Sequence, residues 1–413
     1  MIFYKETDFQ ETEIGKIPKE WEVAKLKDTC ELIRGTEPGS KTYNKEGKGF
    51  KFIRVSDISK QILETVFVDE KPENLVFCHK ENVLLALDGV PGIVAKGMEG
   101  AISSGIRIVK PANKIDNDFL FYILQHSIVQ KVIMNYTTGT TIKHASRAVD
   151  FITLPLPPLG EQQKIAEILS TVDKAIQKTD EVIAKTERLK KGLMQTLLTR
   201  GIGHKEFKDT EIGRIPKEWK VVGLGDENVA EIRSNKRISG FKRVAFIPME
   251  LIPESSIFTK YEIRSIEEVK SFTYCEKGDL LLAKITPCLE NGKQGLVPDD
   301  VPNSFALATT EVFPILCKGI DKLFLFYILK FSKFRNKIIA SMTGTTGRQR
   351  APKESVEKLQ VPLPPLPEQR QIAEILSTMD KKLELERNER ARLERIKRGL
   401  MDLLLTGKVR VRV

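Results

Sequence analysis

The sequence contains one twenty-residue segment twice, and this duplication restricts the fold more than any other feature. Residues 155–174 read PLPPLGEQQKIAEILSTVDK and residues 362–381 read PLPPLPEQRQIAEILSTMDK, so sixteen of the twenty positions are identical. The prolines fix φ and lack backbone donors, which keeps this part extended. A glutamate follows, Glu161 or Glu368, where the helix dipole favours an anion in the first turn. The chain is therefore predicted to enter a helix at the same point of two repeats.

The repeat extends over the whole chain. Three further motifs recur in the same order, namely IGxIPKEW (14–21 and 212–219), LFYIL (120–124 and 325–329) and TGTT (138–141 and 343–346). Between these motifs, residues 30–110 and 228–315 share little beyond a rhythm of short strands. We therefore expect the shared segments to build a common scaffold and the divergent segments to give the two copies different tasks.

Each copy has the pattern of a mixed α/β domain. Alternating or short apolar runs predict strands at 50–58, 242–252, 83–87 and 280–285. Helical periodicity predicts one helix at 116–134 and one at 321–340, each ending shortly before a TGTT motif. The expected fold class is α+β, with two globular domains in a pseudo-two-fold arrangement.

The run after each PLPP block predicts a long amphipathic helix. Apolar residues recur there at alternating spacings of four and three, as in a heptad seam, and Gly201 and Gly407 lie where a C-terminal cap is expected. Each helix would contain about 37 residues and extend roughly 55 Å. Two such helices of equal length favour mutual pairing as an antiparallel coiled coil.

Charge and composition favour a polyanionic partner. The chain has 67 Lys and Arg residues against 56 Asp and Glu residues, a net charge of +11, which suits nucleic acid. The five cysteines and four histidines are dispersed, so we expect no disulfide framework and no metal site. No apolar run is long enough for a membrane helix, and the N-terminus lacks a secretory pattern, so we expect a cytoplasmic location without membrane association.

Known catalytic motifs are absent from the sequence. It contains no G-x-G-x-x-G after a strand, no P-loop, no H-E-x-x-H and no G-x-S-x-G. It also lacks the N/D-P-P-Y/F tetrapeptide with which amino-methyltransferases hold a target base. We therefore expect the chain not to be an enzyme.

The polar loops that contain TGTT are the strongest candidates for DNA contact. Glycine and threonine give exposed turns whose hydroxyls and amides suit phosphate oxygens, and Arg, Lys and Gln can pair with base edges. The alternative interpretation is a solvated basic loop. The candidates are Thr140, Thr141, Lys143, His144 and Arg147 in the first copy and Thr345, Thr346, Arg348, Gln349, Arg350 and Lys353 in the second. Weaker candidates are Arg54, Lys96, Arg107, Lys236, Arg237, Arg243 and Lys284.

In these motifs the chain resembles the specificity subunit of type I restriction-modification systems. The resemblance covers the full length. It is carried by the PLPPLxEQxxIAEIL blocks, the IGxIPKEW openings, the TGTT loops, and the helix ends RLKKGLMQTLLTRG (188–201) and RIKRGLMDLLLTGK (395–408). Members of that family have two target-recognition domains, each reading one half of a split DNA site, and conserved helices that pair into a spacer.

The resemblance implies a division of the chain and a set of partners. The domains would be 1–160, the first recognition domain; 161–201, the first spacer helix; 202–367, the second recognition domain; and 368–413, the second spacer helix with the C-terminal tail. The partners would be double-stranded DNA, two modification subunits that methylate adenine, and restriction subunits that cleave DNA. S-adenosylmethionine and ATP would bind to those partners, with no cofactor on this chain.

Two alternatives remain open at this point. The chain could be a stand-alone sequence-specific DNA-binding regulator, or a coiled-coil scaffold without a role at DNA. Partner-dependent methylation distinguishes the first from a specificity subunit, and DNA affinity after charge changes in the TGTT loops distinguishes the second.

Overall fold

The computed structural model describes residues 3–59, 65–345 and 347–412. The chain divides into two compact units, Met1–Thr179 with Glu389–Val413, and Asp180–Asn388. The two long helices form no unit of their own, because each is divided between the two units. The boundaries expected at residues 160, 201 and 367 stay predictions.

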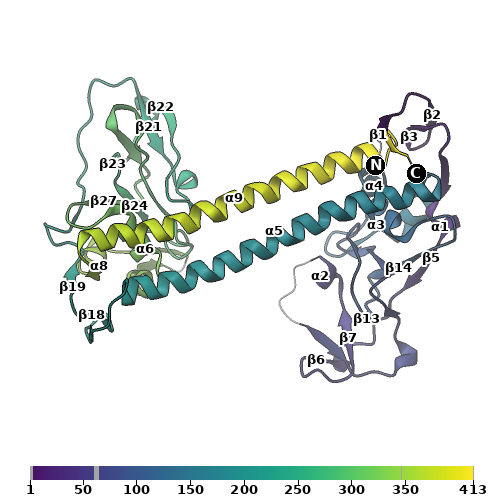
Figure 1. The fold of residues 1–413 in the computed structure, drawn as a ribbon, viewed down its shortest axis with the longest axis horizontal. Helices are drawn as coiled ribbons and strands as arrows, with labels where there is room; N and C mark the ends of the chain where they lie inside the picture. Colours follow the sequence, from purple (N-terminus) through teal and green to yellow (C-terminus); the bar gives the residue numbers. More distant parts are fainter. Residues whose placement is uncertain (1–2, 60–64, 346, 413) are drawn as a thin grey trace. The chain divides into compact units, whose positions relative to one another are not determined.

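The first unit is built from short strands and two nine-residue helices (Figure 1). One four-stranded sheet has the order β12-β10-β14-β5 and one five-stranded sheet the order β6-β8-β7-β13-β9. The elements are β1 (Phe3–Lys5), β2 (Phe9–Thr12), β3 (Gly15–Pro18), β4 (Glu22–Lys25), α1 (Leu26–Thr29), β5 (Cys30–Arg34), β6 (Tyr43–Asn44), β7 (Phe50–Ile53), α2 (Val55–Ile58), β8 (Val66–Val68), β9 (Phe77–Cys78), β10 (Val83–Ala86), β11 (Asp88–Gly89), β12 (Val94–Ala95), β13 (Gly100–Ile102), β14 (Ile106–Pro111), α3 (Asn117–Gln125), α4 (Ser127–Asn135), β15 (Lys143–His144), β16 (Thr153–Leu156) and, from the other end of the chain, β31 (Val409–Val411).

The second unit repeats this plan with two four-stranded sheets, β20-β27-β24-β25 and β22-β21-β26-β23. Its elements are β17 (Phe207–Lys208), β18 (Ile215–Pro216), β19 (Lys220–Gly223), β20 (Ala230–Ile232), β21 (Arg243–Ile247), β22 (Glu262–Ser265), β23 (Thr273–Glu276), β24 (Leu280–Ala283), β25 (Gln294–Leu296), β26 (Phe305–Ala308), β27 (Val312–Cys317), α6 (Lys322–Lys330), α7 (Ser332–Ala340), β28 (Thr343–Thr345), β29 (Arg348–Arg350), α8 (Lys353–Glu357) and β30 (Gln360–Leu363). In both units a parallel strand pair, β7–β13 or β21–β26, lies in an otherwise antiparallel sheet.

The long helices are α5 (Leu159–Arg200, 42 residues) and α9 (Leu366–Leu404, 39 residues). Both begin before the glutamate, because the carbonyls of Pro158 and Pro365 already accept hydrogen bonds from the amides three and four residues later. Both end before a glycine with positive φ, at 64° for Gly201 and 69° for Gly407.

The helices pair in an antiparallel manner inside each unit. In the first unit Lys397, near the end of α9, pairs with Asp173 near the start of α5 at 2.7 Å. In the second unit the roles are exchanged, and Lys190 near the end of α5 pairs with Asp380 near the start of α9. The seam residues Ile165 and Ile372 are fully buried. The beginning of each helix therefore lies beside the end of the other.

Several predicted elements are shorter than the sequence pattern suggested. The strand predicted at 50–58 ends at Ile53, because the Asp57 carboxylate accepts a hydrogen bond from the Arg54 amide (2.6 Å) and starts α2. Pro248 ends the strand predicted at 242–252 after Ile247. These two strand predictions were wrong in their second halves.

The single helices predicted at 116–134 and 321–340 are each two helices. His126 and Phe331 have extended backbone angles (ψ of 152° and 121°) and separate α3 from α4 and α6 from α7. At the first break the His126 ring nitrogen accepts a hydrogen bond from the Ile128 amide, which caps the new helix. Apolar periodicity continues through both breaks, so the pattern alone did not reveal them.

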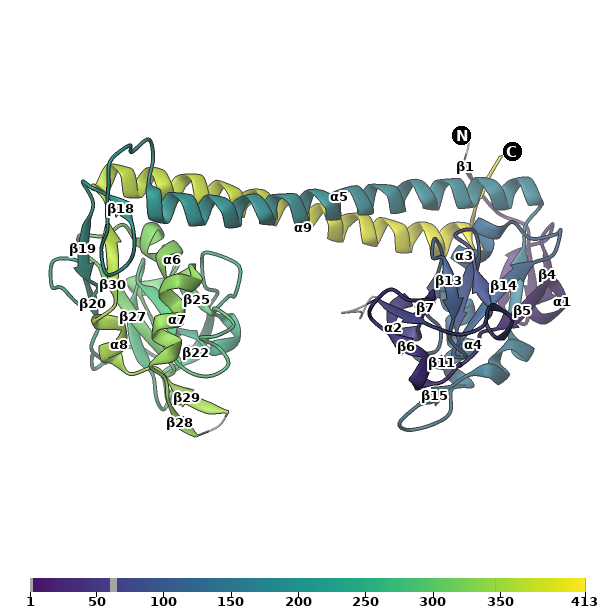
Figure 2. The ribbon, with the colours of Figure 1, turned by 90° about the horizontal axis from the view of Figure 1, so that it is seen from below.

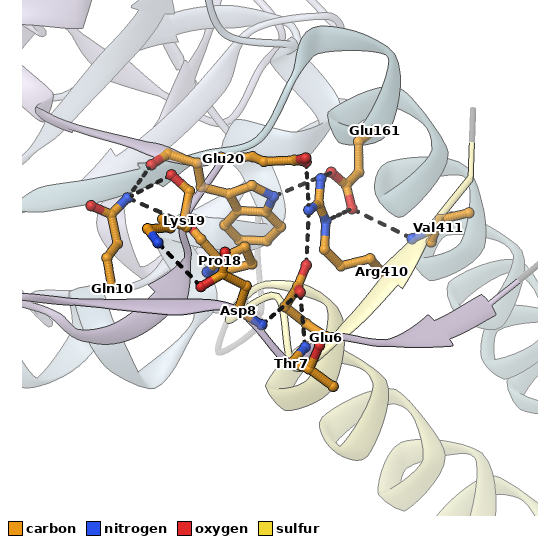
Figure 3. A network of polar contacts seen from close by, with 11 residues as sticks. Glu6, Thr7, Asp8, Gln10, Pro18, Lys19, Glu20, Glu161, Arg410 and Val411 are labelled. Atoms are coloured by element: carbon orange, nitrogen blue, oxygen red, sulfur yellow. Dashed lines mark hydrogen bonds and ion pairs between the residues drawn. The ribbon is translucent and has the colours of Figure 1, made fainter.

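A buried ion network closes the first unit around the start of α5 (Figure 3). Glu161 is 2% exposed and accepts hydrogen bonds from the Trp21 indole (3.2 Å) and twice from the Arg410 guanidinium (3.1 and 2.9 Å). Arg410, 5% exposed, also donates to Glu6 and Glu20 at 2.9 and 2.8 Å. Its hydrogen bonds to Glu161 raise the pKa of the Arg410 guanidinium above its ordinary value.

The second unit has a corresponding arrangement, with a histidine where the first unit has the arginine. Glu368 accepts hydrogen bonds from the Trp219 indole (2.9 Å) and the Ile202 amide (3.0 Å), and His204 Nε2 lies 2.8 Å from its carboxylate. In both units the first turn of one long helix is thus joined to the IPKEW turn and to the segment after the other long helix.

Arg410→Met should lower the free energy of unfolding of the first unit by about 3 kcal/mol, because it leaves Glu161 buried without its counterion. Urea denaturation followed by the fluorescence of Trp21 in a Trp219→Phe background measures this loss. Arg412→Met is the matched control, since Arg412 is exposed and two residues away. Equal stability of the two variants would contradict the role given to Glu161.

Candidate nucleic-acid interface

In each unit the loop that contains TGTT lies on the side of the domain away from α5 and α9 (Figure 2). In the second unit it forms the hairpin β28–β29, in which Thr343 pairs with Arg350 and Thr345 with Arg348. Thr345, Arg348 and Arg350 are exposed, and Gln349 is half-buried. Thr346, also a sequence candidate, lies outside the described residues.

The hairpin of the second unit is fixed at its base by backbone and ionic contacts. The Thr286 amide donates to the Gln349 carbonyl (3.0 Å), and the Ala351 amide donates to the Lys284 carbonyl (2.8 Å). The Arg350 guanidinium donates two hydrogen bonds to the Glu311 carboxylate, at 2.9 and 2.5 Å. These bonds lower the pKa of Glu311, so the carboxylate stays ionised and holds the arginine.

Arg348 differs from Arg350 in having no such restraint. Among the described residues, no carboxylate lies within salt-bridge distance of Arg348, although it is exposed on the same hairpin. Arg350 is therefore positioned by the protein, whereas the charge of Arg348 is available to a partner.

In the first unit, the Asp88 side chain anchors the loop that contains TGTT. Strand β11 pairs with β15, so Asp88 faces His144 across the ladder, and His144 Nδ1 lies 2.8 Å from the Asp88 carboxylate. The Arg107 guanidinium donates to the other oxygen of Asp88 (3.4 Å) and to the Ser146 hydroxyl (3.2 Å). Asp88 thus connects the loop to a buried arginine.

All five candidates of the first loop are exposed, namely Thr140, Thr141, Lys143, His144 and Arg147. Within the described part of the chain, neither Lys143 nor Arg147 has a carboxylate within salt-bridge distance. The loop therefore presents two cations without acidic partners, next to an anchored histidine.

The weaker candidates fall into three groups. Arg107 is 7% exposed, and burial lowers the pKa of its guanidinium, so it supports the loop from beneath the surface. Arg54, Lys96 and Lys284 are half-buried; the first two form ion pairs with Asp57 and Asp118, and Lys284 lies over the Phe313 ring at 5.2 Å. Lys236, Arg237 and Arg243 are exposed, and Lys236 pairs with Glu276 at 2.8 Å.

Lys353 lies at the start of α8, immediately beyond the hairpin. It is exposed and pairs with Glu357 at 3.1 Å one turn later. All of these assignments to a DNA-contacting surface stay predictions.

Asp88 and Glu311 are the residues of this region that the sequence interpretation missed. Both are acidic, whereas phosphates and base edges are bound mainly by basic and amide side chains. Their one sequence signal is position, since Asp88 follows a buried strand and Glu311 precedes one. Each unit therefore presents an exposed basic loop that one carboxylate anchors to the domain.

The family model of the type I restriction modification DNA specificity domain matches the chain twice, at residues 18–188 and 216–395. The chain therefore belongs to the family of type I restriction-modification DNA specificity proteins. The predicted family is thereby confirmed, and so is the α+β class with two recognition domains and two long helices.

Two relatives from one organism match over nearly their whole length. The type I restriction enzyme MjaVIII specificity subunit of Methanocaldococcus jannaschii is 31% identical over 449 residues, covering 100% of this chain and 98% of the relative. The MjaIX specificity subunit of the same organism is 25% identical, covering 99% and 98%. A solved S subunit from M. genitalium has a TM-score of 0.55 at 15% identity, covering 93% of this chain and 96% of that one, which shows a shared fold.

Asp88→Asn should loosen the first loop and cost roughly 2 kcal/mol, because it removes the charged partner of both His144 and the buried Arg107. Hydrogen exchange should become faster at the backbone amides of 137–147, and urea denaturation should show the lost stability. Asp150→Asn serves as control, because Asp150 is exposed and pairs with Lys27 at the surface, at 3.6 Å. Unchanged exchange in the loop would contradict the anchoring role.

Proposed function

We propose that the chain is the specificity subunit of a type I restriction-modification complex and that each recognition domain reads one half of an asymmetric bipartite DNA site. The observation that carries this proposal is the pair of exposed basic loops, built on matching scaffolds but with different side chains. Lys143 and Arg147 in one unit and Arg348 in the other are cations without acidic partners among the described residues. Different residues on a common frame suit two different half-sites.

The exposed cations would bind phosphates and base edges, while the anchored residues would fix their direction. Because Glu311 holds Arg350 and Asp88 holds His144, these side chains lose less conformational entropy when DNA binds. Arg350 remains bound to a carboxylate, so we assign direct contact first to Arg348 and Gln349.

The proposal also assigns partners and cofactors. Methylation of adenine would reside in two modification subunits that use S-adenosylmethionine, and ATP-dependent cleavage in restriction subunits, with no catalysis by this chain. The complex would act on cytoplasmic DNA. Across the described residues, 3–59, 65–345 and 347–412, no helix is both long and apolar enough to span a membrane.

Arg348→Gln should weaken binding to duplex DNA and reduce the slope of log K against log salt by about one, because one phosphate or base contact is lost. Fluorescence anisotropy over a range of salt concentrations measures both quantities. Lys217→Gln removes the same charge from the same unit at an exposed residue near the long helices, where it pairs with Glu206 (3.0 Å). If both variants bind like the wild type, the chain is a scaffold and the proposed reading surface is wrong.

Partner-dependent methylation tests the function as a whole. The full-length chain, its modification subunit and S-adenosylmethionine are incubated with genomic DNA, and sequencing maps the modified adenines. Methylation should appear at one bipartite sequence and only when the chain is present. Sequence-specific DNA binding without methylation in this mixture would identify a stand-alone regulator instead.

The same assay shows whether the long helices set the gap between the half-sites. Four added residues lengthen a helix by about 6 Å, and DNA rises about 3.4 Å per base pair, so the gap should change by one or two base pairs. Because both helices are divided between the units, the insertions belong in both, near residues 179 and 388. An unchanged gap would show that the helices do not determine spacing.

A further inference from the structure

The second unit contains a cavity of about 660 Å³ between the end of α5, the start of α9 and the α6–α7 pair. Its apolar lining comes from Met194, Phe326, Phe331 and Leu383. The charged lining residues are Lys190, Lys191, Lys330, Lys333, Arg387, Glu187, Glu254 and Asp380, so cations outnumber carboxylates. Pockets of this size and mixed character are typical of small-molecule sites.

Two of the five cations are already paired. Lys190 binds the Asp380 carboxylate, and Arg387 donates to Glu187 at 2.7 Å. In the described part of the chain, Lys191 and Lys333 have no carboxylate within salt-bridge distance. The lining therefore has positive charge that no carboxylate of the unit pairs with.

Lys330 adds a further unpaired cation. Its ammonium donates to the backbone carbonyls of Glu254 (2.6 Å) and Gly292 (2.7 Å), which are neutral acceptors. Burial lowers the pKa of Lys330 to about 7, and repulsion from Arg335 and Lys190 contributes to this shift.

Arg335 lies close to Lys330 but does not line the cavity itself. It is 8% exposed, donates to the Gln294 side chain at 2.6 Å, and its Nε has no hydrogen-bond partner among the described residues. Its guanidinium packs against Gly292, where an added Cβ would lie only 2.3 Å from a guanidinium nitrogen. A buried arginine and a half-buried lysine that form no salt bridge with any described residue are unfavourable unless an anion comes close to them.

The first unit shows that the fold does not require these charges. Alignment of the LFYIL motifs pairs Lys330 with Gln125, Lys333 with Ile128, and Arg335 with Gln130. Alignment of the long helices pairs Arg387 with Asp180 and Gln195 with Asp402. Gln130 donates to the Gly92 carbonyl at 2.8 Å, much as Lys330 binds Gly292. These five differences make the second unit more positive, and only the lining residue Asn336, which corresponds to Lys131, differs in the opposite sense. The net positive charge is therefore a property of this site and not of the scaffold.

We propose that this cavity binds a small phosphate-bearing organic ligand, whose phosphates contact Lys191, Lys330 and Lys333 and whose apolar part lies against Phe326, Phe331 and Leu383. A phosphate group brings more than one negative charge and several acceptor oxygens, which matches a cluster of cations better than a single carboxylate does. The site is separate from the basic loops and does not depend on the proposed DNA-reading function.

Isothermal titration of the full-length chain with ATP and with inorganic phosphate tests the site. ATP should bind saturably and more tightly than phosphate, because only ATP has an organic part that can pack against Phe326, Phe331 and Leu383. The double variant Lys330→Gln, Arg335→Gln carries the residues of the first unit and should fold, while its affinity for ATP falls tenfold or more. Lys217→Gln removes an exposed charge elsewhere in the unit and should bind ATP like the wild type.

The pH dependence gives a second measurement. Binding of an anion favours the charged form of Lys330, so the affinity should decrease as pH rises above 7 and binding should take up a proton. The groups that face Lys330 are Arg335 from α7, Lys190 from α5, Asp380 from α9 and Glu254 from the loop after β21. Lys330→Gln should lose part of this pH dependence, and since the titration of ATP itself is common to both proteins, the difference belongs to the lysine.

Three outcomes would overturn the proposal. They are no saturable binding of either probe at millimolar concentration, equal binding by the wild type and the double variant, or loss of ATP binding in Arg348→Gln with the double variant unaffected. The last would place the anion at the basic hairpin. None of these outcomes bears on partner-dependent methylation, so the two proposals can fail separately.

Discussion

A glutamate in the first turn of each long helix, buried at Glu161 and half-buried at Glu368, is the constraint on which both units depend. A carboxylate removed from water is unfavourable unless donors surround it. Glu161 obtains them from Trp21 and Arg410, and Glu368 from Trp219 and His204. These donors come from the IPKEW turn and from the segment after the other long helix, so the three parts must meet if the charge is to be satisfied.

The glutamine after each glutamate joins the same helix turn to the recognition domain. Gln162 accepts a hydrogen bond from the Asp116 amide at 2.8 Å, and Gln369 accepts one from the Asp321 amide at 2.7 Å. Asp116 and Asp321 are the N-caps of α3 and α6. The dipeptide Glu-Gln therefore joins a long helix to the domain helices on one side and to the chain ends on the other, which gives a physical reason for its presence in both copies.

The sequence was sufficient to predict the parts of the structure that repeat. Duplication of the PLPP blocks, the heptad seam and the capping glycines led to two long helices with their pairing, and the TGTT motifs marked the exposed loops. The sequence was insufficient where a tertiary contact determines the end of a helix or the burial of a side chain. His126 and Phe331 break a helix whose apolar pattern continues, and Arg107 has the sequence of a surface cation although Asp88 holds it inside the domain. No local pattern shows which carboxylate will fold back onto which arginine.

The duplication also makes the differences between the copies informative, because each unit is a folded control for the other. Where both copies carry the same group, as in the hydrogen bonds from Tyr122 to Asp173 and from Tyr327 to Asp380, the contact serves the shared scaffold. Where they differ at equivalent positions, the scaffold tolerates either residue. The loops after TGTT differ in this way, and so do the two positions held by Lys330 and Arg335 in one unit and by Gln125 and Gln130 in the other. Stability alone therefore does not explain these substitutions, and the charges without salt bridges that they leave are the basis of both ligand proposals.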